Sequence, residues 1–177
     1  MTVLRVIALI DRLAVLPQYL LPKLALTRFA GWVATRRWGA VSHWMIRDFI
    51  RRYGVNMQEA ERPHASDYAC FNEFFSRALK PGARPVSGVP FVCPVDGAIS
   101  QLGRIEGDQI FQAKGHRYST QALVGGDAAL AREFERGDFA TIYLSPRDYH
   151  RIHMPCAGRL LRMVHVPGDL FSVNPTT

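Results

Sequence analysis

The chain has 177 residues, of which 48% are hydrophobic and 21% charged, and 22 Lys and Arg against 15 Asp and Glu give a net charge of +7. A chain of this size buries roughly 70% of its unfolded surface, so a wholly disordered protein is excluded and one globular domain, or a large piece of one, is expected. Cys70, Cys93 and Cys156 form no Cys-x-x-Cys pair. Their spacing argues against a zinc ribbon or a disulfide framework and fits a reducing compartment.

The basic charge is concentrated at the front of the chain. Residues 1–62 hold ten Lys and Arg against four Asp and Glu, whereas residues 63–177 are nearly neutral. The same front segment contains all three tryptophans, Trp32, Trp38 and Trp44. Cationic, aromatic and aliphatic residues mixed at helical spacing are typical of a helix that lies in a membrane interface. We therefore predict that residues 1–62 are a basic, amphipathic helical region that associates with an anionic membrane surface.

The front segment does not have the pattern of a membrane span or a secretory signal. A span needs about 20 consecutive apolar residues, and Asp11 and Arg12 interrupt the early apolar stretch. The expected location is therefore peripheral, on the cytoplasmic side of the cell membrane. Nucleic acid is not an expected partner, because the sequence has no zinc finger, RNP-like strand or continuous basic helix.

The clearest helical pattern covers Ala40 to Tyr53. One broad face holds its apolar residues, Val41, Met45, Ile46, Phe49 and Ile50, and the opposite face its charged residues, Arg47, Asp48, Arg51 and Arg52. This pattern fits two alternatives, a surface helix packed on a protein core or a helix facing lipid. The nearby tryptophans and basic charge modestly favour lipid.

After residue 62, short apolar runs alternate with Gly and Pro. We predict short helices at Phe71–Leu79 and Ala128–Arg136, with an extended connection through LKPGARPV. The predicted strands are Phe91–Val95, Ala98–Leu102, Gln109–Ala113, Ala140–Leu144, Arg151–Met154 and Arg159–Val166. The expected fold class is α+β, with amphipathic helices in residues 1–62 followed by a β-rich barrel or sandwich in residues 63–177 that is incomplete at its C-terminus.

Three local patterns contain residues with catalytic chemistry. In PVDGAIS, residues 94–100, Asp96-Gly97 is first of all a hairpin-turn signal. In YLSPRDYHRIHMP, residues 143–155, His150 and His153 can serve as acid and base near neutral pH. A structural role for these histidines remains equally open, and a metal site is less favoured because no third ligand is evident. VPGDLFSVN, residues 166–174, is by itself an ordinary loop.

Six segments taken together resemble one known family. They are LPKLALTRFAGW at 21–32, FNEFFSRALKPGARPV at 71–86, PVDGAISQLG at 94–103, QAKGHRYS at 112–119, YLSPRDYHRIHMP at 143–155 and VPGDLFSVN at 166–174. In this order they resemble the front part of bacterial phosphatidylserine decarboxylase proenzymes. The resemblance covers nearly the whole chain.

The resemblance implies a pyruvoyl-dependent carboxy-lyase that converts phosphatidylserine to phosphatidylethanolamine and CO2 through a Schiff base. Family proenzymes cleave themselves before a serine in a Leu-Gly-Ser motif, and that serine becomes the pyruvoyl group on a separate α chain. Asp96 and His153 match the family's aspartate and histidine, which would form a triad with the serine. His150 matches the other family histidine, a candidate to protonate the carbanion or to contact the carboxylate. No metal is implied.

The sequence departs from the family pattern at the nucleophile. None of its eight serines follows a glycine, and the chain stops at Thr177, shortly after VPGDLFSVN. We therefore expect a β-chain portion that holds the base and its orienting acid, with phosphatidylserine as substrate and the α chain as partner. One alternative is a truncated, catalytically inactive membrane-binding remnant, and another is a metal-dependent hydrolase built on His150 and His153. Self-association into a homo-oligomer remains open.

Overall fold

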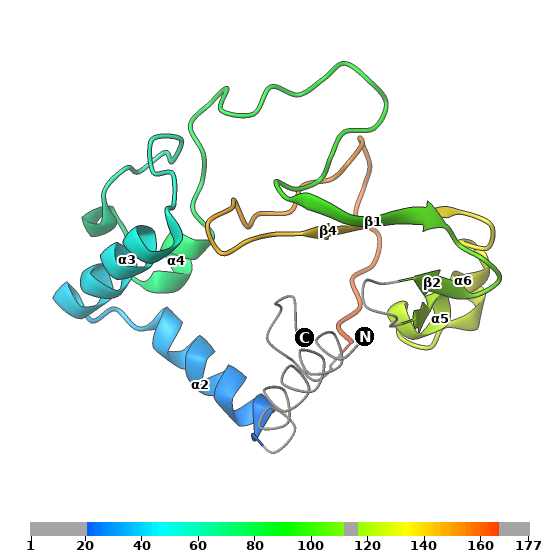
Figure 1. Cartoon of the computed structure of the whole chain (residues 1–177), viewed down its shortest axis with the longest axis horizontal. Helices are drawn as coiled ribbons and strands as arrows, with labels where there is room; N and C mark the ends of the chain where they lie inside the picture. The colour runs from blue at the N-terminus through cyan, green and yellow to red at the C-terminus, as the bar shows by residue number, and fades with distance from the viewer. Residues whose placement is uncertain (1–20, 112–116, 167–177) are drawn as a thin grey trace, which may run out of the picture. The chain divides into compact units, whose positions relative to one another are not determined.

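A computed structural model of the chain describes residues 21–111 and 117–166. These residues fall into two compact units, one containing residues 21–36 and the other Arg37–Val166. The helices are α2 (Lys23–Thr35), α3 (Ala40–Tyr53), the 3-10 turn η1 (Ala65–Asp67), α4 (Phe71–Phe75), α5 (Thr120–Leu123) and α6 (Ala128–Arg132). The strands are β1 (Ala98–Arg104), β2 (Gln109–Phe111), β3 (Arg117–Ser119) and β4 (Asp138–Tyr143) (Figure 1). The predicted α+β class is confirmed.

Helix α2 exposes its large apolar side chains. Phe29 and Trp32 stack with their ring centroids 6.0 Å apart, and the guanidinium of Arg36 lies 4.5 Å from the centre of the Trp32 ring. None of the helix's residues is buried. Within the described parts of the chain, no helix has the length and apolar character needed to cross a bilayer.

Helix α3 has the predicted bounds, Ala40–Tyr53. The helix ends because Gly54 adopts a left-handed conformation with φ of 64° and donates its backbone N–H to the carbonyl of Ile50. Ile46, on the predicted apolar face, is fully buried in the protein core, whereas Trp44 stays 59% exposed. The Ile46 side of α3 therefore packs on protein, as the first of the two alternatives for this helix requires.

The main core is an aromatic cluster, which we define by its buried members Ile46, Val55, Tyr68 and Phe74. Phe49 contacts Phe74 edge to face, with the ring centroids 5.9 Å apart. The hydroxyl of Tyr68 donates a 2.7 Å hydrogen bond to the carbonyl of Arg62. This core joins α3 to α4 and thus packs residues on both sides of position 62 against each other.

The described strands form two small antiparallel sheets, β1 with β4 and β2 with β3. Ala98 pairs with Tyr143 and Arg104 with Asp138, and the register shifts between Ile99 and Gln101. Figure 1 shows β1 and β4 side by side as the longest ribbon of the second unit. Over the described residues this is not a closed barrel or a sandwich.

Two predicted strands, Phe91–Val95 and Arg151–Met154, are wrong as regular strands. These segments do meet, through hydrogen bonds from the Val92 N–H to the Pro155 carbonyl and from the His153 N–H to the Pro94 carbonyl. The pairing extends no further because Pro94 and Pro155 lack the N–H groups that a longer ladder needs. Two hydrogen bonds therefore stand where regular strands were expected.

The last predicted strand, Arg159–Val166, is also wrong, because its backbone forms no ladder with any described strand. The predicted strands at 98–102, 109–113 and 140–144 correspond to β1, β2 and β4 with shifted ends, and residues 112–113 lie outside the described residues. Most of the QAKGHRYS segment and nearly all of VPGDLFSVN also lie outside them.

The two short helices predicted in residues 63–177 end early. The helix that begins at Phe71 ends at Phe75, because Glu61 N–H bonds to the Ala78 carbonyl and Lys80 N–H to the Glu59 carbonyl, which pulls the chain into extended pairing. The LKPGARPV connection is not extended at its start. Lys80 to Ala83 closes a turn with Gly82 at φ of 79°, the geometry that Pro-Gly favours in a type II turn. The helix from Ala128 ends at Arg132 and continues only as isolated turns.

Candidate functional site

The backbone brings the Asp96 and His153 segments together. His153 donates its backbone N–H to the Pro94 carbonyl at 2.9 Å, which places Asp96 two residues beyond the point of contact. Gly97 lies so close to β4 that a Cβ atom there would be 2.6 Å from the carbonyl oxygen of Tyr143. A glycine is required because any side chain would separate the turn from the strand. The Asp96-Gly97 dipeptide thus leads directly into β1, and β1 pairs with the strand that precedes the histidines.

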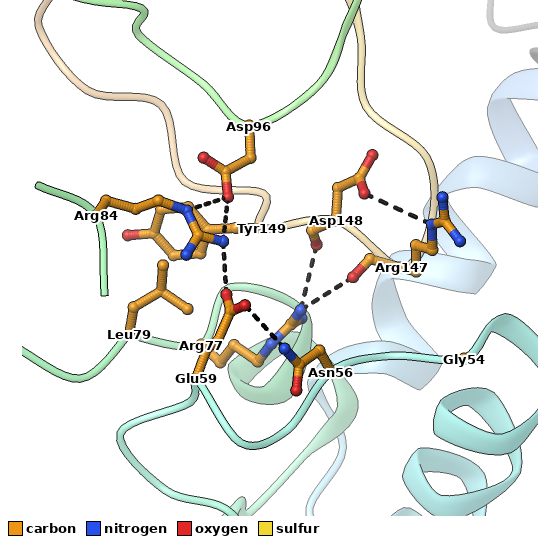
Figure 2. A pocket seen from close by; sticks show the side chains of 10 residues that line it. All are labelled: Gly54, Asn56, Glu59, Arg77, Leu79, Arg84, Asp96, Arg147, Asp148 and Tyr149. Atoms are coloured by element: carbon orange, nitrogen blue, oxygen red, sulfur yellow. Dashed lines mark hydrogen bonds and ion pairs between the residues drawn. The ribbon is translucent and has the colours of Figure 1, made fainter. Parts of the chain in front are cut away.

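The carboxylate of Asp96 is bound by Arg84, which lies just after the Lys80–Ala83 turn. Arg84 Nε donates to Asp96 Oδ2 at 2.7 Å, and Nη2 forms an ion-pair contact with the same oxygen at 2.6 Å (Figure 2). Nη2 also contacts Glu59 Oε2 at 2.6 Å. These two carboxylates raise the pKa of the Arg84 guanidinium above its ordinary value, Asp96 contributing most, so the arginine is permanently charged.

The imidazole of His153 contacts the neighbouring Tyr149. The Tyr149 hydroxyl lies 2.9 Å from Nε2 of His153, and the two rings stack with centroids 5.5 Å apart. Tyr149 is buried, whereas His153 is exposed. Within the described residues, Nδ1 of His153 has no hydrogen-bond partner, and its Nε2 is held by a hydroxyl group.

His150 has a different environment. Its ring stacks on Phe75 with centroids 4.1 Å apart, and its Nε2 lies 3.1 Å from the Ser145 carbonyl. A carbonyl only accepts, so Nε2 carries the hydrogen and Nδ1 of the neutral ring remains a proton acceptor. Asp148 Oδ2 accepts the Ser145 N–H and closes the turn that holds this segment.

A cavity of about 270 Å³ adjoins Asp96. Its walls include Asp96, Arg84 and Tyr149 but neither histidine, and Figure 2 shows their side chains around it. Arg77, another wall residue, is only 3% exposed, and its Nη2 donates to the carbonyls of Arg147 and Asp148 at 3.2 and 3.3 Å. Burial lowers the pKa of this guanidinium. The cavity is therefore bordered by groups of both charges.

The structure brings the predicted residues together only in part. The backbones of the Asp96 and His153 segments are paired, but the Asp96 carboxylate contacts Arg84 and the His153 ring contacts Tyr149. No hydrogen bond joins the two side chains, and within the described ranges no three His, Cys, Asp or Glu side chains converge on a common metal position.

Sequence reasoning missed Arg84, Glu59 and Tyr149. The sequence of the LKPGARPV connection around Arg84 does not indicate which partner its guanidinium contacts. Tyr149 lies inside the histidine segment, but nothing in its spacing indicates that its hydroxyl meets His153. Glu59 is separated from Arg84 by 25 positions, and only the pairing of residues 59–61 with 78–80 brings them close.

Comparison with known proteins identifies the family. A model of the family described as phosphatidylserine decarboxylase matches residues 71–177. The chain belongs to the phosphatidylserine decarboxylase family. A second family model, described as PSD, matches residues 13–54.

Curated relatives with the name phosphatidylserine decarboxylase proenzyme are closely similar in sequence. Those of Variovorax paradoxus (strain S110) and Methylibium petroleiphilum are 70% and 68% identical over 167 residues, and that of Azoarcus sp. (strain BH72) is 69% identical. Each match covers 94% of this chain but only 58–59% of the relative. The chain thus spans somewhat more than half the length of these relatives.

Proposed function

We propose that this chain is the β-chain portion of a phosphatidylserine decarboxylase, a carboxy-lyase that forms phosphatidylethanolamine and CO2. The observation that carries the proposal is the pairing of the Pro94 and His153 backbones, which brings together the two segments that match the family's catalytic motifs. We further propose that Asp96 and His153 act in proenzyme self-cleavage and that His150 acts in decarboxylation.

Two atoms without a hydrogen-bond partner among the described residues, Nδ1 of His153 and Oδ1 of Asp96, support a triad arrangement. Both contacts of Arg84 go to Oδ2 of Asp96, so Oδ1 is the oxygen that would accept a hydrogen bond from Nδ1 of His153 in the proposed triad. That bond would fix the tautomer in which Nε2 is the proton acceptor. Nε2 would then remove the proton of a serine hydroxyl and later return it to the leaving amine.

The side chains near His153 fit a hydroxyl nucleophile and the pyruvoyl group made from it. The Tyr149 hydroxyl already occupies the hydrogen-bonding position at Nε2, which shows that an oxygen fits there at 2.9 Å. When present, the pyruvoyl group supplies an electron sink for loss of CO2. Nδ1 of His150 is the atom we assign to proton transfer in that step, since it can take up a proton and then donate it to the carbon that has lost CO2.

The test uses a full-length proenzyme that contains this sequence. We expect Asp96→Asn and His153→Ala to leave the proenzyme uncleaved on a denaturing gel. His150→Ala should cleave normally and then release CO2 from serine-labelled phosphatidylserine at least about a hundredfold more slowly, the usual scale of a lost acid or base.

The exposed His64 provides a matched control, since His64→Asn removes an imidazole outside the proposed site, keeps a side chain able to cap η1, and should change neither step. Normal cleavage of both Asp96→Asn and His153→Ala would overturn the assignment. A wild-type proenzyme that never cleaves would favour the inactive remnant instead.

We also propose that the basic front region, residues 1–62, holds the enzyme peripherally on the cytoplasmic face of an anionic membrane. The exposed aromatic pair of α2, Phe29 and Trp32, together with Arg28 and Lys23 on the same helix, supports this role. Apolar side chains would enter the interface while the cations bind lipid phosphates.

Co-sedimentation with vesicles tests the membrane proposal. We expect the chain to pellet with phosphatidylglycerol-containing vesicles at low salt, to pellet less at high salt, and to lose most binding in a Phe29→Ser/Trp32→Ser variant. Leu102→Ser, which alters an exposed residue of β1, is the control. Equal recovery with and without vesicles would refute the proposal.

The α chain is the proposed partner, and its docking would complete the β-rich fold into a larger barrel or sandwich. The support is an exposed apolar surface in the segment that follows His150. Its large side chains are 59–86% exposed: Ile152, Met154, Leu160, Leu161, Met163 and Val164. An apolar run of this kind is typical of a surface that another polypeptide covers.

A further inference from the structure

Arg84 has a geometry that suits orientation of a carboxylate better than simple charge neutralisation. All three of its guanidinium nitrogens are engaged. Nε donates to Asp96, Nη2 donates to Glu59 and also forms an ion pair with Asp96, and Nη1 donates to the Ala83 carbonyl at 2.7 Å. A planar guanidinium whose nitrogens all have partners is fixed in one orientation. The Asp96 carboxylate bound to it is therefore fixed as well.

Glu59, on the other side of Arg84, is itself fixed. Asn56 Nδ2 donates to Glu59 Oε1 at 2.8 Å, and the Glu59 carbonyl accepts the Lys80 N–H at 2.8 Å. A chain of contacts therefore runs from Asn56 through Glu59 and Arg84 to Asp96, as the dashed lines from Asn56 to Asp96 in Figure 2 show.

The same contacts determine which oxygen of Asp96 is available. Both Arg84 nitrogens use Oδ2, and among the described residues Oδ1 accepts no hydrogen bond. An arginine that occupied both oxygens would block the histidine. In the observed arrangement Arg84 binds Oδ2 of Asp96 and leaves Oδ1 available to the histidine.

These ion pairs are poorly placed to contribute much stability. The side chains of Arg84, Glu59 and Asp96 are 45%, 37% and 30% exposed, and ion pairs this exposed contribute little to folding. A role in orientation accounts for the full use of the guanidinium better than a role in stability does.

We propose that Arg84 is a positioning residue for self-cleavage: it holds Asp96 by Oδ2, with Glu59 as its anchor, so that Oδ1 can accept the hydrogen bond of His153. The inference rests on the proposed triad role of Asp96 and His153 and adds to it the group that orients the acid. Arg84 touches neither the serine nor the scissile bond in this scheme.

The experiment measures the rate of self-cleavage in the full-length proenzyme. Arg84→Gln should slow cleavage by up to about a hundredfold, the scale on which a 1 Å misplacement of a catalytic group lowers a rate. Arg84→Lys, which keeps the charge but lacks the fork, should recover part of that loss. Glu59→Gln should slow cleavage less, and the Glu59→Gln/Arg84→Gln double variant should be no slower than Arg84→Gln alone, because Glu59 acts through Arg84.

Arg104→Gln is the matched control, since Arg104 is 78% exposed and forms a 3.7 Å ion pair with Asp138 at the far end of β1. It should cleave at the wild-type rate. Thermal unfolding of each uncleaved variant separates a loss of stability from a loss of orientation. A purely structural role would lower the melting temperature together with the cleavage rate.

The outcomes distinguish this inference from the proposed function. If Asp96→Asn stops cleavage while Arg84→Gln cleaves at the wild-type rate, the positioning role is wrong and the triad stands. If Asp96→Asn cleaves normally, the triad role is itself wrong and the positioning role falls with it. Equal rates for Arg84→Lys and Arg84→Gln, or additive effects in the double variant, would also overturn the inference.

Discussion

Two regions of the second unit bury their apolar residues to very different extents. In the aromatic cluster, Ile46 and Phe74 are completely buried and Tyr68 is 1% exposed. In the segment from 152 to 166, Leu161 and Met163 are 79% and 86% exposed. The apolar side chains of the aromatic cluster are buried against each other, whereas those of the segment that contains His153 are largely exposed to solvent. The scaffold behind the site is therefore packed by residues of this chain, whereas the apolar side chains that follow His153 remain exposed.

The largest effect on stability is expected at the centre of the aromatic cluster. Phe74→Ala removes a fully buried ring that contacts Phe49 and Tyr68, and should lower the free energy of unfolding by about 3–5 kcal/mol. Urea denaturation followed by tryptophan fluorescence measures it. Leu161→Ala, at an exposed position, should change it by less than about 0.5 kcal/mol. Similar losses at both positions would mean that the two regions do not differ as described.

A smaller effect is expected at Arg77, which connects the aromatic cluster to the turn that precedes His150 and His153. Its buried guanidinium donates to the carbonyls of Arg147 and Asp148, and Arg77→Met would leave both carbonyls without that donor. We expect a loss of about 1–3 kcal/mol, the usual result when a buried hydrogen bond loses one partner. Methionine retains most of the apolar contact with Phe74, so the variant tests the hydrogen bonds. An unchanged urea midpoint would show that the histidine segment is held by other contacts.

The smallest effect is expected at Glu73, on the rim of the aromatic cluster. The Ala69 N–H, and after it Arg62, lower the pKa of the Glu73 carboxyl below its ordinary value. A carboxyl with a depressed pKa in the folded state stabilises the protein above its unfolded pKa, about 4.3, and loses that contribution as the pH falls through the lower folded value.

Glu73→Gln should therefore cost less than about 1 kcal/mol at pH 7, because the side chain is partly exposed, and the difference from wild type should shrink below about pH 4. Thermal unfolding at pH 7 and pH 3.5 measures both values. A difference that grows in acid would contradict the sign of the pKa shift.

The sequence predicted the parts of the fold that depend on local pattern. Helix α3 has the predicted bounds because its apolar period and Gly54 are both local signals. The prediction of regular strands at 91–95 and 151–154 was wrong because Pro94 and Pro155 lack the N–H groups that a longer ladder needs. The paired motifs of Asp96 and His153 were found through family resemblance, whereas the contacts of Arg84 depend on a tertiary pairing that no local pattern reveals.

Gly97 places a limit on how the sequence around Asp96 can vary. A Cβ atom at this position would approach the Tyr143 carbonyl oxygen to 2.6 Å and a methyl group of Ile142 to 2.8 Å, and the backbone oxygen has no freedom to move away within the ladder. Even alanine at position 97 would therefore force β1 and β4 apart and disrupt their pairing at the end where Asp96 lies. A library randomised at codon 97 and selected for self-cleavage should return glycine alone, although no atom of that residue takes part in the chemistry.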